Sequence, residues 1–250
     1  MSQSKKQSEE STDYFGKNEL VISENSLESY NRFIVKKFIK NSNLKKITHT
    51  KYETEILDFG AGMGSLALVW KEITGQLVEC LEIDQEQLDL IKQRGFTGWN
   101  SIHQIPKKYS FIYTSNVLEH IDDDKKCLNE LADLLKSGCR IGIYVPAFNM
   151  LFSDLDRAVG HYRRYSKNEL QNKVKQSGFK VVSCKYVDSL GFFASLVIKL
   201  LGWKSVGNIG SPRSLKFYDK VIFPISRIID AITLGQLFGK NLLLIAEKTQ

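Results

Sequence analysis

Three glycines between two acidic residues form the stretch whose residue types and spacing are best suited to chemistry. Asp58 is followed closely by Gly60, Gly62 and Gly64, and Glu82 comes at the end of the next apolar run. Glycines allow the backbone to turn tightly and let a ligand approach without a Cβ atom in the way. An apolar strand is expected before the loop and a helix after it, so the first N–H groups of that helix would point at the ligand. The pattern predicts a cradle for a nucleotide-type ligand.

The spacing of the glycines indicates which ligand the cradle would hold. The dinucleotide fingerprint has glycine at the sixth place of G-x-G-x-x-G, and this chain has Ser65 there. Asp58 would be placed poorly for a pyrophosphate, whereas its charge suits a ligand that carries an ammonium and a sulfonium group. Glu82 ends a strand at the position from which a ribose diol is bound in such folds. NAD and a purely structural turn are the alternatives.

The D-x-G-x-G-x-G loop and the strand-terminal Glu82 resemble motif I and its acidic partner in class I S-adenosylmethionine-dependent methyltransferases. The resemblance implies S-adenosyl-L-methionine as the cofactor. Asp58 would meet the methionine ammonium group through water, and Glu82 would bind the ribose hydroxyls; a helix cap and an exposed strand end are the respective structural alternatives. Ile83 would pack on the adenine, and Asn116 would line the methionine tail. The expected cofactor-binding residues are Asp58, Gly60, Ala61, Gly62, Gly64, Glu82, Ile83 and Asn116.

Two further segments narrow the resemblance. Residues 116–123 are similar to the motif after strand four in ubiquinone-type and related small-molecule methyltransferases. Residues 160–166, Gly-His-Tyr-Arg-Arg-Tyr-Ser, resemble a subset found among bacterial enzymes of glycan and envelope biosynthesis. These resemblances imply a small or lipid-linked acceptor, above all a sugar hydroxyl of an envelope glycan precursor that becomes O-methylated. Residues 1–52 and 189–240 match only loosely.

Methyl transfer from a sulfonium is an in-line displacement to which the protein supplies proximity, alignment and desolvation. A hydroxyl acceptor must also lose a proton, so a base helps. The candidate catalytic bases are His161, in the loop after strand five, and His120, just beyond strand four. His120 could instead only pack and hydrogen-bond, and a carboxylate such as Glu119 or Asp154 is the alternative base.

Tyr162, Arg163 and Arg164 share the loop of His161 and are the expected substrate-binding residues. A planar guanidinium group suits phosphate or carboxylate, so the two arginines would hold an anionic part of the acceptor. The alternative is a pair of surface arginines that bridge to helix acids such as Asp154 or Asp156.

Composition and charge leave other partners open. The chain has 250 residues, a net charge of +7 and a pI of about 9.1, which allows nucleic acid, a phosphorylated substrate or a membrane surface as a partner. An RNA methyltransferase is therefore a rival, although residues 115–118 lack the Asn/Asp-Pro-Pro-aromatic sequence of amino-methylating enzymes. A protein that binds the cofactor without turnover is a second rival.

The cysteines indicate the cellular compartment of the protein, and the histidines indicate whether it binds a metal. Four cysteines are scattered with no C-x-x-C pair, which is typical of a reduced, cytoplasmic protein. The four histidines are unclustered in the sequence, so no metal is expected. Residues 1–13 are polar throughout, so we expect a disordered tail and no signal peptide there.

From residue 53 on, apolar runs and helical patterns alternate, which predicts an α/β fold with parallel strands and right-handed crossovers. The resemblance extends this to a Rossmann-like mixed sheet of seven strands, the last antiparallel, with helices on both faces and a helical insertion between strands six and seven. We expect a single domain over 14–250, with an N-terminal helical arm at 14–52 and a helical lid at 189–240. The strands are expected near 56–59, 77–82, 95–103, 110–114, 140–145, 181–187 and 241–247.

Local signals predict where several helices begin and end. Asn25 or Ser26 is expected to cap a helix that runs to about Lys40. The pair Ser137-Gly138 is expected to stop another.

The insertion at 189–240 carries two apolar stripes at helical spacing. Charged residues, among them Lys199 and Arg227, interrupt the stripes, so each is too short to span a membrane. A lid over the acceptor site is one interpretation. Peripheral contact with the inner face of a membrane, with lysines near the headgroups, is the other.

Overall fold

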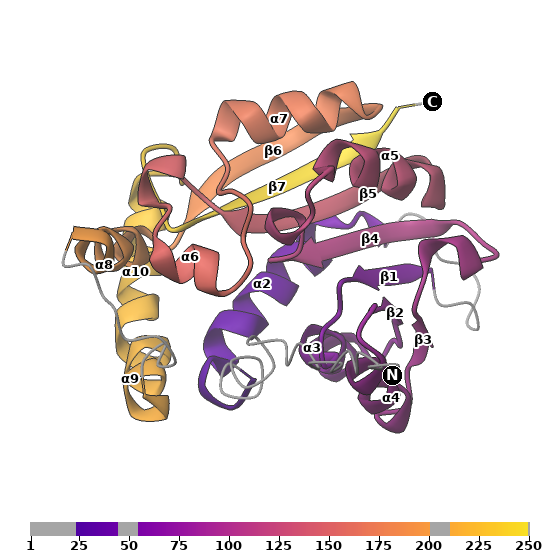
Figure 1. The fold of residues 1–250 in the computed structure, drawn as a ribbon, viewed down its shortest axis with the longest axis horizontal. Helices are drawn as coiled ribbons and strands as arrows, with labels where there is room; N and C mark the ends of the chain where they lie inside the picture. The colour runs from indigo at the N-terminus through magenta and orange to yellow at the C-terminus, as the bar shows by residue number, and fades with distance from the viewer. Residues whose placement is uncertain (1–23, 45–54, 201–210, 250) are drawn as a thin grey trace, which may run out of the picture.

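The computed structural model describes residues 24–44, 55–200 and 211–249 (Figure 1). The tail expected at 1–13 lies outside the described residues. So do 14–23 and 45–52 of the expected N-terminal arm and 201–210 of the insertion.

The strands form one seven-stranded sheet in the order β3-β2-β1-β4-β5-β7-β6. β1 pairs in parallel with β2 and β4, whereas β7 runs antiparallel to both of its neighbours, β5 and β6. The predicted mixed sheet with an antiparallel last strand is confirmed. The strands are β1 (Ile56–Phe59), β2 (Glu79–Leu81), β3 (Thr97–Trp99), β4 (Tyr109–Ser115), β5 (Leu135–Pro146), β6 (Phe179–Val187) and β7 (Asn241–Lys248).

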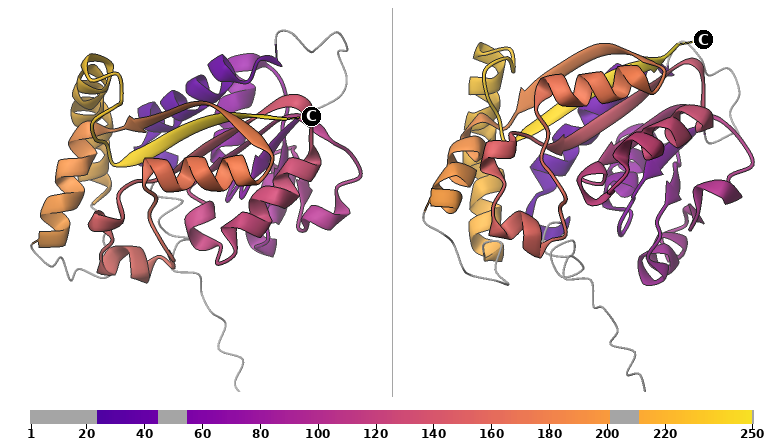
Figure 2. Two further views of the ribbon diagram at one scale, coloured as in Figure 1. Left: turned by 90° about the horizontal axis from the view of Figure 1, so that it is seen from above. Right: turned by 45° about the horizontal axis from the view of Figure 1, so that its top comes forward.

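Helices cover both faces of the sheet (Figure 2). α5 and α7 pack on one face and α2 and α3 on the other, while α8, α9 and α10 form a separate group beyond the end of β6. The helices are α2 (Glu28–Asn41), α3 (Ser65–Thr74), α4 (Gln85–Gln93), α5 (Asp124–Leu134), α6 (Asp154–Ala158), α7 (Lys167–Gln176), α8 (Ser189–Leu200), α9 (Pro212–Phe217) and α10 (Phe223–Ile232).

The core lies on both sides of the sheet because the central strands are apolar along their length. β4 is buried at every position before Ser115, as expected of a strand covered on both faces. On the side of α2 and α3, the Trp70 indole stacks on Tyr113 with ring centroids 5.2 Å apart, and Phe38 stacks on Tyr113 at 5.3 Å. These aromatic contacts hold α3, and with it the glycine loop that leads into it, against the middle of the sheet.

β5 begins earlier than the sequence predicts. α5 ends at Leu134 and the strand starts directly with Leu135. The pair Ser137-Gly138 therefore lies inside β5, and its expected role as a helix stop is wrong. Gly138 has φ +73°, and the pairing with β4 changes register in this region, so the glycine allows an irregularity in the strand.

The start of α2 is capped from a distant part of the chain. Neither Asn25 nor Ser26 caps the helix as expected, and the residue just before it makes no side-chain cap. The carboxylate of Asp219 accepts hydrogen bonds from the N–H groups of Ser29 at 2.9 Å and Tyr30 at 2.8 Å. Asp219 lies in a π-helical turn (Tyr218–Ile222) that leads into α10. An acid at this end of a helix satisfies its first N–H groups and complements its dipole.

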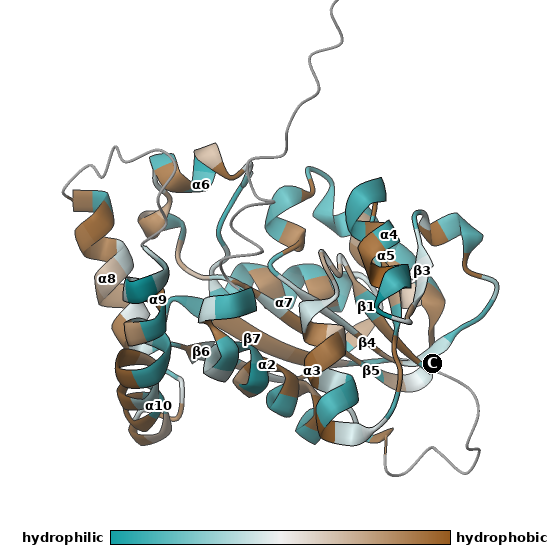
Figure 3. Cartoon of the chain, turned by 90° about the horizontal axis from the view of Figure 1, so that it is seen from below, coloured by the Kyte–Doolittle hydropathy of each residue, from teal (hydrophilic) through white to brown (hydrophobic). Residues whose placement is uncertain are grey.

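The insertion is helical where it is described. α10 packs against α8 and reaches α2, since the rings of Phe223 and Tyr30 lie 4.6 Å apart. α8 and α10 are largely hydrophobic (Figure 3), and Ile228 and Ile232 are exposed to 61% and 77%. Among the described residues, no helix combines the length and the hydrophobicity needed to cross a membrane.

Candidate active site

The glycine loop turns at the carboxyl end of β1. Its backbone is tied to β2, because the N–H groups of Gly60 and Ala61 both donate to the carbonyl of Leu81, at 2.9 and 3.0 Å. Gly60 has φ +72°, and a Cβ atom on it would lie 2.3 Å from a methyl carbon of Val117. The segment after β4 therefore packs directly on the loop, and only glycine fits at this position.

Glu82 connects the loop to the end of β2. Its carboxylate accepts hydrogen bonds from the N–H of Gly62 at 2.8 Å and from the N–H of Asp84 at 3.0 Å. Burial raises the pKa of Glu82, and these two N–H donors oppose that rise. A carboxylate has about four acceptor positions, so Glu82 retains the capacity to accept ribose hydroxyls.

Asp58 is buried in β1. The hydroxyl of Tyr113 donates a hydrogen bond to its carboxylate at 3.1 Å. Burial raises the pKa of Asp58 to about 8, and the neighbouring Glu82 contributes to the rise. A ligand with a positive charge near this carboxyl group would favour its ionised form.

The remaining expected cofactor contacts lie at the same edge of the sheet. Ile83 follows β2 and is 82% exposed, and Asn116 follows β4 and is also exposed. Asn116 adopts a left-handed conformation, with φ 54°, and its N–H donates to the carbonyl of Tyr144. β2 and β4 flank β1, so both residues border the glycine loop. The glycine loop fits a nucleoside ligand because the carboxylate of Glu82 stands beside it with acceptor positions left for ribose hydroxyls.

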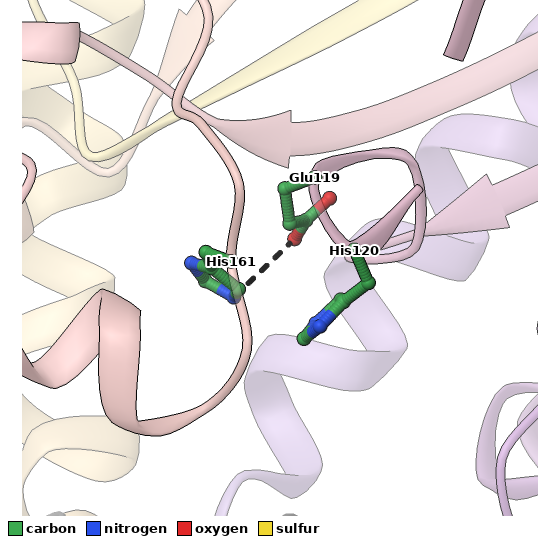
Figure 4. A group of neighbouring side chains, drawn as sticks. All are labelled: Glu119, His120 and His161. Atoms are coloured by element: carbon green, nitrogen blue, oxygen red, sulfur yellow. Dashed lines mark ion pairs between the residues drawn. The ribbon is translucent and has the colours of Figure 1, made fainter. Parts of the chain in front are cut away.

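The two candidate bases are brought together with one acid. His120 and Glu119 lie in a 3-10 turn (Leu118–His120) directly after β4, and His161 lies in the loop after α6. The ring centroids of the histidines are 4.6 Å apart, and Nε2 of His161 is 4.0 Å from Oε1 of Glu119. Figure 4 shows the three side chains converging. We call Glu119, His120 and His161 the histidine cluster. Two of the four histidines, which are scattered in the sequence, thus lie together in the structure.

Backbone hydrogen bonds join the two segments of the cluster. The N–H of Tyr162 donates to the carbonyl of Glu119 at 2.8 Å and so joins the two segments. Within the second segment, the N–H of His161 donates to the carbonyl of Asp156, also at 2.8 Å. His120 hydrogen-bonds to the backbone of Gly160. These contacts fix the approach of segments far apart in the sequence, and sequence periodicity does not encode them.

Glu119 is the least satisfied group of the site. Its side chain is fully buried, and neither carboxylate oxygen has a hydrogen-bond partner in another described residue. Burial raises the pKa of Glu119 to about 8. Burial and the neighbouring His161 lower the pKa of His120 to about 4. The sequence pointed to Glu119 only as an alternative base.

Asp156 is a site residue that the sequence mentioned only as a possible partner of surface arginines. Its Oδ1 lies 2.9 Å from Nδ1 of His161 and accepts from Nε of Arg164 at 2.8 Å, while Oδ2 accepts from the N–H of Ser153. Burial alone would raise the pKa of Asp156, but His161 and Arg164 lower it to about 2. The Ser-x-x-Asp spacing at the start of α6 is typical of a capping box, in which the acid turns back toward the backbone of Ser153. This spacing is the sequence signal that could have pointed to Asp156.

The expected substrate-binding residues have unequal surroundings. Tyr162 is 59% exposed. Arg164 is buried and pairs with Asp156, whereas Arg163 is partly exposed and pairs with Asp124 at 3.0 Å. Each arginine therefore has a carboxylate partner within the protein, and a role in acceptor binding stays a prediction.

A hollow of about 290 Å³ lies between α6 and α8. Phe152, Leu155 and Ile198 supply apolar lining. Arg157 and Asp154 of the lining form an ion pair at 2.7 Å, and Lys199 supplies a further cation. The lining is therefore both apolar and charged, with one cation in excess.

Comparison with known proteins identifies the class. A family model described as a methyltransferase domain matches residues 28–184, which is more than half of the chain. The chain therefore belongs to the methyltransferase-domain family. Its sheet order and glycine loop are those of the class I S-adenosylmethionine-dependent methyltransferases, enzymes whose cofactor is S-adenosyl-L-methionine.

Named relatives share this class. The sarcosine/dimethylglycine N-methyltransferase of Aphanothece halophytica is 28% identical over 149 residues, which are 49% of this chain and 53% of that protein, so the chain spans about half the length of this curated relative. The structure of a putative sarcosine dimethylglycine methyltransferase from Galdieria sulphuraria superposes with a TM-score of 0.57 at 17% identity, over 88% of this chain and 85% of that one. Phosphoethanolamine N-methyltransferase 2 of Haemonchus contortus, solved with S-adenosyl-L-methionine, gives a TM-score of 0.54 at 16% identity, over 86% and 53%.

Proposed function

We propose that the chain transfers the methyl group of S-adenosyl-L-methionine to a hydroxyl group of a small or lipid-linked acceptor, in particular a sugar hydroxyl of an envelope glycan precursor. The observation that carries this proposal is the position of the histidine cluster. Glu119 and His120 follow β4 directly, and Val117 of the same segment packs on Gly60 of the glycine loop. His161 reaches them from the loop after α6. Groups able to accept a proton therefore adjoin the expected site of the methyl donor.

The chemistry of a hydroxyl acceptor fits this arrangement. Asp156 is held ionised by Arg164, so it binds the Nδ1–H of His161 and leaves Nε2 as the proton acceptor. As the acceptor oxygen attacks the methyl carbon, its proton passes to that nitrogen and the sulfonium leaves as a neutral thioether. The cofactor would be held by Asp58 and the glycine loop, with Glu82 at the ribose.

The acceptor side supports a molecule with anionic and apolar parts. The hollow between α6 and α8 has both kinds of lining. Tyr162, Arg163 and Arg164 would contact the anionic part from the loop of His161. The exposed apolar residues of α8 and α10 would lie against the inner face of a membrane if the acceptor is lipid-linked.

Incubation of the protein with methyl-labelled S-adenosyl-L-methionine and fractionated cell extract tests this function. We expect label in the lipid-linked or small saccharide fraction, and loss of that label with His161→Ala. Label found only in RNA would replace the proposal with the RNA rival. Tight cofactor binding with no labelled product in any fraction would indicate a binding protein without turnover.

Methylation of a small amine is the second candidate. It is favoured by the 28% identity to a sarcosine/dimethylglycine N-methyltransferase. An amine acceptor needs less help from a base, so its methylation should survive His161→Ala when assayed above the amine's own pKa. Turnover of sarcosine or dimethylglycine by the purified protein, with no labelled saccharide, would establish this candidate.

A further inference from the structure

The geometry points to a divalent metal site formed by Glu119, His120 and His161, which would take a cation of the zinc class. One ligand atom from each side chain lies within 4.8 Å of those of the other two. Ligands about 2.1 Å from one ion are about 3 to 3.5 Å apart, so small side-chain rotations would close the set around a cation. Two imidazoles and one carboxylate are the donors of open, three-ligand zinc sites.

Glu119 supplies an observation independent of this clustering. A fully buried carboxylate without hydrogen bonds to other described residues is costly to maintain. Figure 4 shows it directed at His161, whose Nε2 is 4.0 Å away and too far for a hydrogen bond. A cation placed between these atoms would satisfy both oxygen and nitrogen.

The surroundings orient both imidazoles as they are oriented in metal sites. Asp156 holds Nδ1 of His161 at 2.9 Å, which leaves Nε2 for the cluster. The backbone of Gly160 plays the corresponding part for His120. Carboxylate or carbonyl support of this kind accompanies almost every metal-bound histidine, because it fixes the tautomer and the ring direction.

The site would remain open to one side. Glu119 is buried, whereas both histidines are only half-buried, so solvent or an acceptor oxygen could take a further coordination position. If the proposed function holds, and this step rests on it, the cation would bind the acceptor hydroxyl. In the metal-loaded enzyme Nε2 of His161 would be a ligand and no longer the base, so the O–H bond would break with loss of the proton to water. The new C–O bond forms as the sulfonium carbon–sulfur bond breaks, with its electron pair going to sulfur.

Metal binding is tested on the full chain after treatment with a chelator. Co²⁺ is titrated and followed by its visible absorption, and Zn²⁺ is measured by competition for the same site. We expect one ion per chain, and a loss of affinity of at least about 100-fold in each of Glu119→Gln, His120→Ala and His161→Ala. Asp156→Asn should weaken binding by about 10- to 100-fold, because it removes the charge that orients His161 and leaves the three ligands in place. It also removes the ion pair with Arg164, so the fold of this variant is checked as well.

His103→Ala is the matched control, since His103 is exposed and lies outside the cluster. Circular dichroism and the affinity for S-adenosyl-L-methionine check that each variant is folded. The isosteric Glu119→Gln keeps the test decisive if a histidine variant fails to fold. The site is refuted if the wild type binds Co²⁺ no better than Glu119→Gln. The readout contains no acceptor, so its failure is distinct from a failure of the proposed methyl transfer.

Discussion

At the scale of single residues, Glu82 combines two tasks. Its carboxylate already binds the N–H of Gly62, and in the proposed complex it also accepts the ribose hydroxyls. Glu82→Gln keeps the shape but replaces one oxygen by a donor. We expect the affinity for S-adenosyl-L-methionine, measured by calorimetry, to fall by about 1–3 kcal/mol.

The control for this prediction is Glu86→Gln, an exposed position in the first turn of α4. It should leave the affinity for the cofactor unchanged. Equal affinities of the Glu82 and Glu86 variants would remove Glu82 from the cofactor site.

Asp58 makes stability depend on pH. Its pKa is about 8 in the folded chain and near its ordinary value of 3.8 in the unfolded chain, so between these values unfolding releases a proton. The free energy of unfolding of the unliganded protein should therefore fall as pH rises through this window, by up to about 1.4 kcal/mol per pH unit from this group. Asp58→Asn removes that contribution.

Urea unfolding at several pH values between 4 and 8 measures the effect. The stability of Asp58→Asn relative to wild type should increase steadily with pH. Glu82 has a raised pKa of its own and contributes a slope of the same sign to both proteins, so the difference between them isolates Asp58. A difference that does not change with pH contradicts the assignment.

At the scale of elements, the turn from β1 into α3 depends on the contact between Gly60 and Val117. Gly60→Ala adds a Cβ at 2.3 Å from Val117 and strains a backbone at φ +72°. We expect it to destabilise the fold by about 2–4 kcal/mol in thermal or urea unfolding. Gly75→Ala is the matched control, because Gly75 has φ +71° but nothing within 4 Å of the added atom.

The Gly75 variant should lose only about 1 kcal/mol, the backbone part of the effect. Gly60→Ala combined with Val117→Ala should recover part of the loss, since two of the three close contacts are with the Val117 methyl carbons. Equal losses in the two glycine variants would show that the contact with Val117 is unimportant.

The elements also show what the sequence could predict. The glycine loop and the acid Glu82 after β2 rest on local patterns, and the seven-stranded sheet with an antiparallel last strand rests on the family resemblance; the structure has all of them. The pairing of His120 with His161 and the cap on α2 were beyond the same reasoning. Each joins segments far apart in the chain, and each depends on how loops fold back rather than on periodicity.

At the scale of the whole molecule, Asp219 links the insertion to the first described helix. It is buried and accepts hydrogen bonds from the N–H groups of Ser29 and Tyr30. Asp219→Asn removes the charge at the helix N-terminus and opposes an N–H with an NH₂ group. We expect a loss of about 1–3 kcal/mol in the free energy of unfolding.

Asp89→Asn is the control, because Asp89 is exposed and its carboxylate accepts a hydrogen bond from Gln85 of the same helix, α4. Hydrogen exchange should show faster exchange in α2 for the Asp219 variant and unchanged exchange in β4. If both variants behave alike, the cap on α2 contributes nothing to stability.

The contacts of Tyr30 also determine when α2 can pack during synthesis of the chain. Its hydroxyl hydrogen-bonds with Tyr144 and with Asn241, and its N–H with Asp219. When Tyr30 leaves the ribosome, all three partners are still to be synthesised. α2 can therefore reach its final place only after almost the whole chain has been released. Until then its exposed apolar face can aggregate, and binding to a chaperone would protect it.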